Sequence, residues 1–410
     1  MQIPVRLLHN LFKHFMQKKI TQHLRVSVLT LLLGFVGFMG TAQEKSSFKI
    51  GGTVRYNIFT KSWVDSKTQP EFTWDTWRLN VSGSAGGIDL NFEYRFYPTF
   101  GTHFIHHGYF GYAFTDDLYM KLGVTQVPFG ITKFASHSWW FQGQYYFGLE
   151  DDYDMGIKFD YDGIEKLDLS FAYFRQAEPE GPIAGGEVTY GASGPGRYSY
   201  DITPGSGKID TTLVDASIRE LNQVNLRAAY HLSEAIEVGF SAQAGGIYNS
   251  VLNKSELSTA FAAHVYATWG QGWDFKGSLI NYNYAARSDN NEELDIIQMG
   301  AYGTAYDVAS KANVYSAGIA KNFNVEWGPI NAIQIYTDYT WVDKINDDFY
   351  DMQQLVPGML ISAGPVYTYI DYAMGKNHPW INSTFGAGMG AGDADAEWMK
   401  RFNINIGYYF

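Results

Sequence analysis

Residues 87–98 read Gly-Ile-Asp-Leu-Asn-Phe-Glu-Tyr-Arg-Phe-Tyr-Pro, in which apolar and polar side chains alternate along the length of one strand. Successive side chains of a β-strand face opposite sides, so Ile88, Leu90 and Phe92 share one face and the residues between them share the other. One face suits an apolar environment and the other suits water. The pattern therefore predicts a strand over 87–97 with one apolar side and one wet side.

The same alternation recurs along the chain, in 76–82, 118–125, 167–173 and 224–232. Repeated segments of about ten residues with this period are the sequence signature of a membrane-spanning β-barrel. We therefore predict an all-β chain that forms a transmembrane antiparallel β-barrel of about 16 strands, wide enough for an aqueous interior. We expect the strands at 48–60, 72–83, 87–97, 105–115, 118–126, 154–162, 167–176, 222–232, 235–248, 258–269, 272–284, 296–308, 312–322, 330–342, 356–371 and 399–410.

The connections between these strands alternate in length, as expected when short turns face the periplasm and long loops face outward. The long connections are 127–153, 177–221, 285–295 and 372–398. The alternation breaks between 309 and 371, where the expected outer loop is shorter than the expected turn. We expect strand boundaries in that region to be the least well predicted.

Composition agrees with a barrel. Aromatic residues make up 17% of the chain, with 30 Tyr and 28 Phe, whereas charged residues make up 18%. Strands favour aromatic side chains, and tight turns favour glycine, of which the chain has 43. Cysteine is absent, which excludes disulfide scaffolds, cysteine nucleophiles and zinc sites built on cysteine.

Residues 1–42 are predicted to be a cleaved signal peptide. Basic residues without any acid precede an apolar run over 26–39, and small residues at 40–42 suit a signal peptidase. The apolar run is shorter than the roughly 20 residues that a spanning helix requires. The start is either Met1 or Met16. Translation from Met1 gives an unusually long basic region, whereas Met16 gives one of more ordinary length.

Residues 43–410 then form the barrel domain. Removal of the signal peptide takes away five basic residues and no acidic ones, which leaves 25 basic and 42 acidic residues and a net charge of −17. Binding to nucleic acid needs clustered lysine and arginine, so the charge balance argues against a nucleic-acid partner.

The last strand ends on Phe410, and every second residue before it is apolar: Tyr408, Ile406, Ile404 and Phe402. This arrangement resembles the signal by which the barrel-assembly machinery recognises its substrates. Together with the signal peptide it predicts a location in the bacterial outer membrane, in contact with lipid and lipopolysaccharide.

Three motifs carry a more specific resemblance: Phe48-Lys-Ile-Gly-Gly52, Arg78-Leu-Asn-Val-Ser-Gly83 and Leu122-Gly-Val-Thr-Gln-Val-Pro-Phe-Gly130. The chain is similar to the phosphate-selective porin O and P family, in the form common in Bacteroidetes-type bacteria. The resemblance implies a porin. Family members that select phosphate line the constriction with stacked arginines and lysines, whereas Arg78 stands alone where the family often has two or three basic residues. Selectivity for phosphate is therefore not carried over.

Charged side chains of both signs are expected to face the lumen. Arginine binds phosphate or carboxylate through two parallel hydrogen bonds, so a basic strip can guide anions. Alternatively, the charges pair across strands and only keep the channel wet. The expected pore-lining residues are Arg55, Arg78, Glu93, Arg95, Lys121, Lys158, Asp160, Arg227 and Lys276.

Residues 127–153 stand where general porins fold a loop inward to narrow the channel. Aromatic residues beside polar groups can form a slide for sugars, or they can belong to the aromatic girdle at the membrane interface. The candidates for this constriction loop are Trp139, Trp140, Tyr145, Tyr146, Glu150 and Asp151.

Neither a metal site nor a cofactor is predicted. His106 and His107 are adjacent in a predicted strand, so their side chains should face opposite sides and not converge on one ion. Acidic clusters at 289–295, 347–351 and 393–397 lack the spacing of a calcium-binding loop.

The sequence thus predicts a channel for passive diffusion of small hydrophilic solutes, including anions such as phosphate, and not an enzyme. Trimers are common among barrels of this size, so a homotrimer is expected by analogy. One alternative is a surface receptor or adhesin that uses the loop 177–221. Another is an outer-membrane hydrolase, although a nucleophile motif such as Gly-x-Ser-x-Gly is absent.

Overall fold

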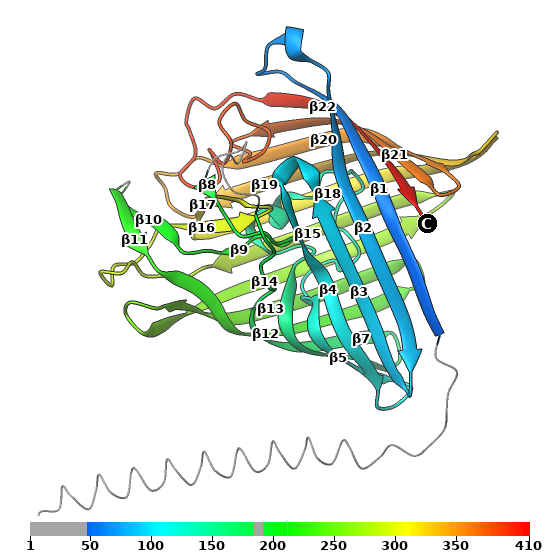
Figure 1. Ribbon diagram of the computed structural model, residues 1–410, viewed down its shortest axis with the longest axis horizontal. Coiled ribbons are helices and arrows are strands. Elements are labelled where there is room, and N and C mark those ends of the chain that lie inside the picture. Colours follow the sequence, from blue (N-terminus) through cyan, green and yellow to red (C-terminus); the bar gives the residue numbers. More distant parts are fainter. Residues whose placement is uncertain (1–46, 184–191, 211) are drawn as a thin grey trace, which may run out of the picture. The chain divides into compact units, whose positions relative to one another are not determined.

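The computed structural model describes residues 47–183, 192–210 and 212–410. Sixteen of the described strands form one closed barrel in which neighbours run antiparallel (Figure 1). The predicted signal peptide lies outside the described residues. The barrel strands are β1 (Ser47–Lys61), β2 (Glu71–Ala85), β3 (Ile88–Tyr97), β4 (Thr102–Ala113), β5 (Leu118–Gln126), β6 (Tyr153–Ile164), β7 (Leu167–Ala177), β12 (Ile218–Ser233), β13 (Ile236–Asn249), β14 (Lys254–Trp269), β15 (Trp273–Asn283), β18 (Lys311–Trp327), β19 (Ile330–Lys344), β20 (Met352–Ala363), β21 (Val366–Lys376) and β22 (Met399–Tyr409).

The first and last strands close the barrel. β1 pairs with β22 from Thr53 opposite Tyr409 to Lys61 opposite Arg401. Beyond the last pair, Gly52 and Phe410 exchange two backbone hydrogen bonds of 2.9 and 3.0 Å. The terminal residue is thus part of the seam, and the closed barrel leaves no unpaired strand edge.

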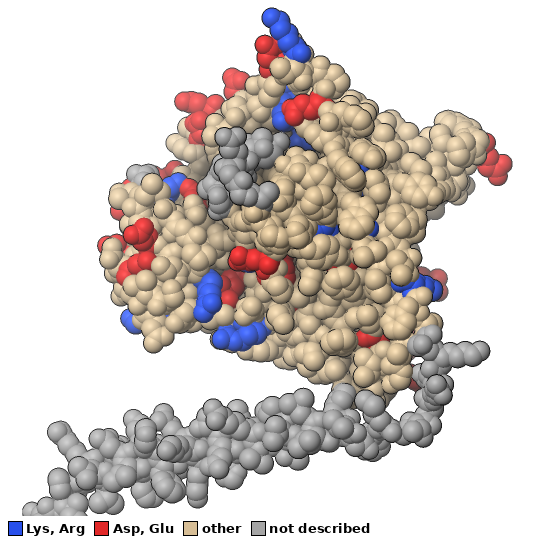
Figure 2. All heavy atoms as spheres, in the orientation of Figure 1, with Lys and Arg blue, Asp and Glu red and all other residues tan. Residues whose placement is uncertain are grey.

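The outer wall is apolar, as the alternation predicts. Figure 2 shows one face on which uncharged side chains cover most of the wall. In β3, Phe96 is exposed on the outside, whereas Arg95 and Tyr97 on either side of it are buried in the interior. Large exposed hydrophobic residues recur around the barrel, among them Phe110, Leu122, Phe171, Leu226, Phe240, Leu279 and Ile335. An outer band of this kind is expected to face lipid.

Six short strands form a second sheet at the barrel end where the long loops lie (Figure 1). They are β8 (Ala192–Ser193), β9 (Asp201–Ile202), β10 (Gly205–Ile209), β11 (Thr212–Ala216), β16 (Ile296–Ala301) and β17 (Thr304–Ala309). The helices among the described residues are short 3-10 turns: η1 (Ser66–Thr68), η2 (Pro98–Phe100) and η3 (Gly143–Phe147). None of them is long and apolar enough to cross a membrane.

The prediction of a barrel strand at 296–308 is wrong. This segment is a hairpin, β16 and β17, with its turn at Tyr302 and Gly303, where both residues have positive φ. Its residues are almost all buried on both faces, because the hairpin belongs to the second sheet and not to the barrel wall. Alternation shows that a strand exists but does not show which sheet it joins.

The prediction of a single strand at 356–371 is also wrong. The segment is divided between β20 and β21 by a turn at Gly364 and Pro365, and Gly364 has φ +60°, a conformation suited to glycine. One barrel strand was therefore predicted in excess and one was missed, so the count of 16 is confirmed. With these corrections, 328–329 and 364–365 are both short turns, and long and short connections alternate through the region where the predicted pattern broke.

Part of the interior is a packed aromatic core. The Tyr302 ring centre lies 5.0 Å from that of Tyr97, and the Tyr97 and Phe104 rings are 5.5 Å apart. Tyr198 and Tyr200 of the segment between β7 and β12 are also buried in this core. The interior is therefore partly filled by side chains, unlike the fully aqueous interior that strand number alone predicts.

Candidate functional site in the barrel lumen

The loop between β5 and β6, residues 127–152, crosses the barrel interior. It leaves the wall at β5, yet it contacts strands on the far side of the circuit. Arg227 of β12 donates from Nε to the Gly130 carbonyl at 2.8 Å, and Lys276 of β15 donates to the Ser136 carbonyl at 2.9 Å. Gln354 of β20 donates to the Phe141 carbonyl at 3.0 Å. We refer to residues 127–152 as the constriction loop.

His137 is the most strongly held residue of the constriction loop. Its ring Nδ1 lies 2.8 Å from Asp338 of β19, and its Nε2 lies 2.9 Å from Asp274 of β15. Burial by itself lowers the pKa of His137, but the hydrogen bonds with Asp274 and Asp338 outweigh it and raise that pKa above its ordinary value. The His137 ring therefore joins the loop to two wall strands, and the two carboxylates favour its protonated form.

A cavity of about 320 Å³ lies between the constriction loop and the wall formed by β1, β2, β3 and β22. Four arginines line it, one from each of these strands: Arg55, Arg78, Arg95 and Arg401. The strands are neighbours in the closed sheet, so residues far apart in the sequence lie on one patch of wall. Arg78 is therefore not isolated, because its basic companions come from adjacent strands and not from adjacent sequence.

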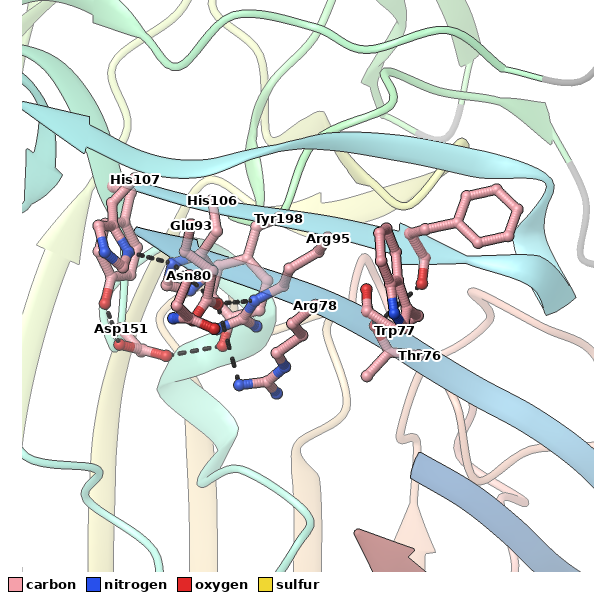
Figure 3. A network of polar contacts seen from close by, with 12 residues as sticks. Thr76, Trp77, Arg78, Asn80, Glu93, Arg95, His106, His107, Asp151 and Tyr198 are labelled. Atoms are coloured by element: carbon pink, nitrogen blue, oxygen red, sulfur yellow. Dashed lines mark hydrogen bonds and ion pairs between the residues drawn. The ribbon is translucent and has the colours of Figure 1, made fainter. Parts of the chain in front are cut away.

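Two carboxylates partly neutralise the arginines. Arg55 pairs with Asp75 at 2.8 Å, and Glu93 accepts a hydrogen bond from Arg95. Arg78 lies 3.9 Å from the same Glu93 oxygen, toward which it extends in Figure 3. Charges in so confined a space are screened less than charges at an open surface. Among the described residues the patch keeps an excess of positive charge, since Arg55, Arg78 and Arg95 share the two carboxylates of Asp75 and Glu93.

His106 and His107 lie beside this patch, and the prediction that they face opposite sides is wrong. The pairing of β3 with β4 shifts register between Glu93 and Tyr94, which makes His106 a β-bulge. The two Nδ1 atoms lie 2.8 Å apart, and with Glu93 the side chains offer three ligand atoms within 4.8 Å (Figure 3). Two arginines, Arg78 and Arg95, act on the single Glu93 carboxylate, so the charge around these ligand atoms is positive and does not favour a metal ion.

Aromatic side chains of the constriction loop face the arginines across the cavity. Trp139 and Trp140 line it, and the Arg401 guanidinium lies 5.1 Å from the centre of the Trp140 ring. Tyr145 and Tyr146 also line it, and Tyr145 donates to the Tyr198 carbonyl at 3.2 Å. All four rings therefore line the arginine cavity.

The two predicted acids of the loop are buried in contacts of their own. Glu150 accepts a hydrogen bond from the Ala135 N–H at 2.7 Å, and burial raises the pKa of Glu150 to about 8. Asp151 accepts hydrogen bonds from Gln126 at 3.0 Å and from the Tyr198 hydroxyl at 2.6 Å. Neither carboxylate lines the cavity beside the arginines.

The remaining predicted pore-lining charges lie on the other wall strands, where Lys276 donates to a loop carbonyl and the others form ion pairs. Lys121 and Lys158 lie 2.9 and 3.6 Å from Asp160, and Arg227 lies 2.6 Å from Glu237. Arg227 and Lys276 line a second cavity of about 310 Å³, which also meets constriction-loop residues 131–133. On this side of the barrel, away from the arginine cavity, lumen charges thus pair between neighbouring strands.

Tyr198, Tyr200 and Tyr302 were not predicted as lumen residues, although all three line the arginine cavity. Tyr198 stacks under Arg95, whose guanidinium lies 4.4 Å from the ring centre. The one available signal was the alternation Tyr198-Ser-Tyr200 inside a predicted loop. The described part of this segment packs into the barrel. Because β12 begins at Ile218, residues 218–221 of the predicted loop 177–221 belong to a wall strand.

The chain matches no protein family, and it matches no curated protein. Solved structures with the same fold include the outer-membrane channel DcaP of Acinetobacter baumannii, with a TM-score of 0.53, 10% identity and coverage of 90% of this chain and 100% of that chain. An anion-selective porin from Comamonas acidovorans has a TM-score of 0.53 and 12% sequence identity, and the match covers 89% of this chain and 100% of that chain. OmpF of Salmonella typhi has a TM-score of 0.54 and 9% sequence identity, and the match covers 88% of this chain and 97% of that chain. At these identities the likeness shows the fold alone, a closed antiparallel β-barrel.

Proposed function

We propose that the protein is a porin of the bacterial outer membrane, through which small hydrophilic solutes diffuse passively. Support comes from the closed barrel with an apolar outer wall, from a charged interior, and from a loop that narrows the lumen. Selectivity in such a channel follows from its width and from the charges along it. The proposal requires no catalytic step and no cofactor.

We further propose that the channel favours small anions, with phosphate as one candidate. The observation that carries this proposal is the convergence of Arg55, Arg78, Arg95 and Arg401 on one cavity. A guanidinium group offers paired N–H donors that match the oxygens of a carboxylate or phosphate. Among Arg55, Arg78 and Arg95, Arg78 has the longest acid contact, at 3.9 Å, and is therefore well placed to meet a passing anion.

The remaining partners are proposed on the same basis. The strand that ends at Phe410 would be recognised by the barrel-assembly machinery, and the outer wall would contact lipid and lipopolysaccharide. A homotrimer stays a prediction from analogy. An adhesin role for the segment before β12 is not favoured, because Tyr198, Tyr200 and Asp201 of that segment are buried in the barrel.

Planar-bilayer recording tests the proposal. The folded barrel should conduct, and the reversal potential in a salt gradient should show chloride and phosphate preferred over potassium. Arg78→Gln should reduce the anion-to-cation permeability ratio about two- to fivefold, because a unit charge a few ångströms away contributes roughly 0.5–1 kcal/mol in water. Arg175→Gln is the matched control, since Arg175 lies exposed near the end of β7 and donates a hydrogen bond to Asn222 of β12. A barrel that never conducts rules out the porin, whereas an unchanged ratio in Arg78→Gln rules out the arginine site.

A further inference from the structure

A separate polar cluster lies where the constriction loop ends and β6 begins. Asp152, Asp154 and Asp201 each offer a carboxylate oxygen, and these three oxygens lie within 4.8 Å of one another. The exposed fractions of the three residues are 7%, 2% and 2%. They come from the constriction loop, from β6 and from β9, so three separate parts of the chain bring like charges together inside the protein.

Glu178, the residue after β7, adds a fourth carboxylate. Its Oε1 accepts the backbone N–H groups of Ser199 at 2.9 Å and Tyr198 at 3.2 Å, and its charge acts directly on Asp201. Ser199 contributes a hydroxyl oxygen, which accepts the Tyr153 N–H at 2.9 Å. The cluster therefore presents oxygen atoms from carboxylates and from one hydroxyl.

The positive charge in contact with this cluster is smaller than its negative charge. Arg197 donates to Asp201 at 3.0 Å, and it also pairs with Glu180 at 2.7 Å. One shared guanidinium thus faces four buried carboxylates, and the partly buried Glu220 adds a fifth carboxylate next to Asp152 and Asp201. Buried carboxylates without a compensating charge are strongly unfavourable, so such a group either takes up protons or binds a cation.

Two oxygen atoms point to a bound cation. Asp154 Oδ1 and Glu178 Oε2 are buried, and neither has a hydrogen-bond partner among the described residues. Asp154 and Glu178 are each only 2% exposed. The other carboxylate oxygen of Asp154 accepts a hydrogen bond from Gln223 at 3.1 Å. Buried polar atoms in native proteins nearly always have partners, and these two oxygens belong to the cluster of like charges, so they are available to a cation.

We propose that Asp152, Asp154, Asp201 and Glu178 form a binding site for a divalent cation, with Ca²⁺ as the ion. Hard oxygen donors without nitrogen or sulfur suit Ca²⁺ and Mg²⁺ and do not suit zinc. Ca²⁺ binds oxygen at about 2.3–2.6 Å, so opposite ligands stand about 4.6–5.2 Å apart, whereas Mg²⁺ requires about 4.0–4.2 Å. Oxygens that all lie within 4.8 Å of one another are close enough to share one ion, and Ca²⁺ tolerates irregular ligand geometry whereas Mg²⁺ requires a near-ideal octahedron.

The site would fix the wall of the arginine cavity. Asp151, next to Asp152, accepts a hydrogen bond from the Tyr198 hydroxyl at 2.6 Å, and Tyr198 lines the cavity. An ion bound by Asp152 of the constriction loop and by Asp201 of β9 would hold together two segments that are far apart in the sequence. Ca²⁺ thereby acts as a structural ion that orders the constriction. This inference does not depend on which solute the channel carries.

Thermal unfolding of the full-length barrel, purified in detergent and freed of metal with a chelator, tests the site. Titration with CaCl₂ or MgCl₂ over about 0.01–10 mM spans the weak sites expected of extracellular proteins. The unfolding temperature should rise with Ca²⁺, and at concentrations at least tenfold lower than with Mg²⁺. Calorimetric titration with Ca²⁺ should give one site per chain.

Asp154→Asn and Glu178→Gln remove one ligand charge each while they keep the shape of the side chain. Both variants should lose the response to Ca²⁺, and both should unfold at a higher temperature than the wild type in chelator, because each relieves repulsion. Asp347→Asn is the control, since Asp347 is exposed in the turn before β20. No Ca²⁺ response in the wild type, or an equal response in Asp154→Asn, overturns the proposal whether or not the barrel conducts.

Discussion

His137 of the constriction loop binds Asp338 of β19 through two separate donors. Its backbone N–H lies 2.8 Å from Oδ2, and its ring Nδ1 lies 2.8 Å from Oδ1. The Ser138 N–H adds a third contact with the same carboxylate at 2.8 Å. One buried wall residue therefore satisfies three donors of a loop that begins on the other side of the barrel, which fixes the path of that loop.

Removal of this carboxylate should destabilise the constriction. Asp338→Ala leaves three buried donors without an acceptor, and we expect a loss of roughly 3–5 kcal/mol in the free energy of unfolding. Denaturant unfolding in detergent measures it. Asp343→Ala on the same strand is the control, since Asp343 accepts one hydrogen bond from Asn313 at 3.2 Å. Equal losses in both variants would show that the loop is held elsewhere.

The same contact should make the stability depend on pH. The pKa of His137 is higher in the folded protein than in the unfolded chain, because its hydrogen bonds with Asp274 and Asp338 outweigh the effect of burial. The stabilisation is fully present below pH about 6.5 and is lost as the pH rises through the folded-state pKa. Unfolding temperatures between pH 5 and pH 9 should fall across this window in the wild type. His137→Gln should remove that fall, and a persistent fall would assign it to another group.

Neutralisation of Glu93 should strengthen the preference for anions. Glu93→Gln keeps the side-chain shape but removes the negative charge shared by Arg78 and Arg95. We expect the anion-to-cation permeability ratio to rise about two- to fivefold, opposite in sign to Arg78→Gln. Reversal potentials measure both. Glu256→Gln is the control, since Glu256 pairs with Arg287 at the partly exposed loop end. A fall in the ratio would contradict the proposed role of the arginines.

Closure of the barrel should depend on a glycine. A Cβ at Gly52 would lie 2.4 Å from the Arg78 carbonyl oxygen and 2.8 Å from the Phe410 ring, closer than atoms can approach. Gly52→Ala should therefore lower the yield of folded barrel, seen as loss of the compact band on unheated gels. At Gly245 a Cβ would be 3.3 Å from its nearest neighbour, so Gly245→Ala should fold with a normal yield. Similar yields would show that the seam tolerates a side chain.

Several features of the candidate site could be predicted from the sequence. Alternation placed Arg55, Arg78 and Arg95 on the inner face, because each strand side chain must point to one side or the other. For the aromatic loop after β5 the sequence left two placements open, the lumen and the interfacial girdle, and the contacts of the loop with Asp338 and Gln354 are decided by the tertiary structure. The convergence of the arginines was not predicted, since it depends on which strands are neighbours in the closed sheet.

Two errors have a common cause. Alternation is a property of a single strand, so it could not distinguish the hairpin 296–309 from a wall strand, and it passed over the turn at Gly364. The side-by-side placement of His106 and His107 depends on a bulge, which appears only when β4 pairs with β3 and one residue has no partner.

The alternation of apolar and polar residues was enough to predict the class of fold and the two faces of its wall, because a period of two is a local property of each strand. The tertiary structure decided what lies inside: the four arginines on one cavity, the loop bound to Asp338, and the buried carboxylates of Asp152, Asp154 and Asp201. These contacts join residues far apart along the chain, and their energies depend on distances and burial that only the closed barrel sets.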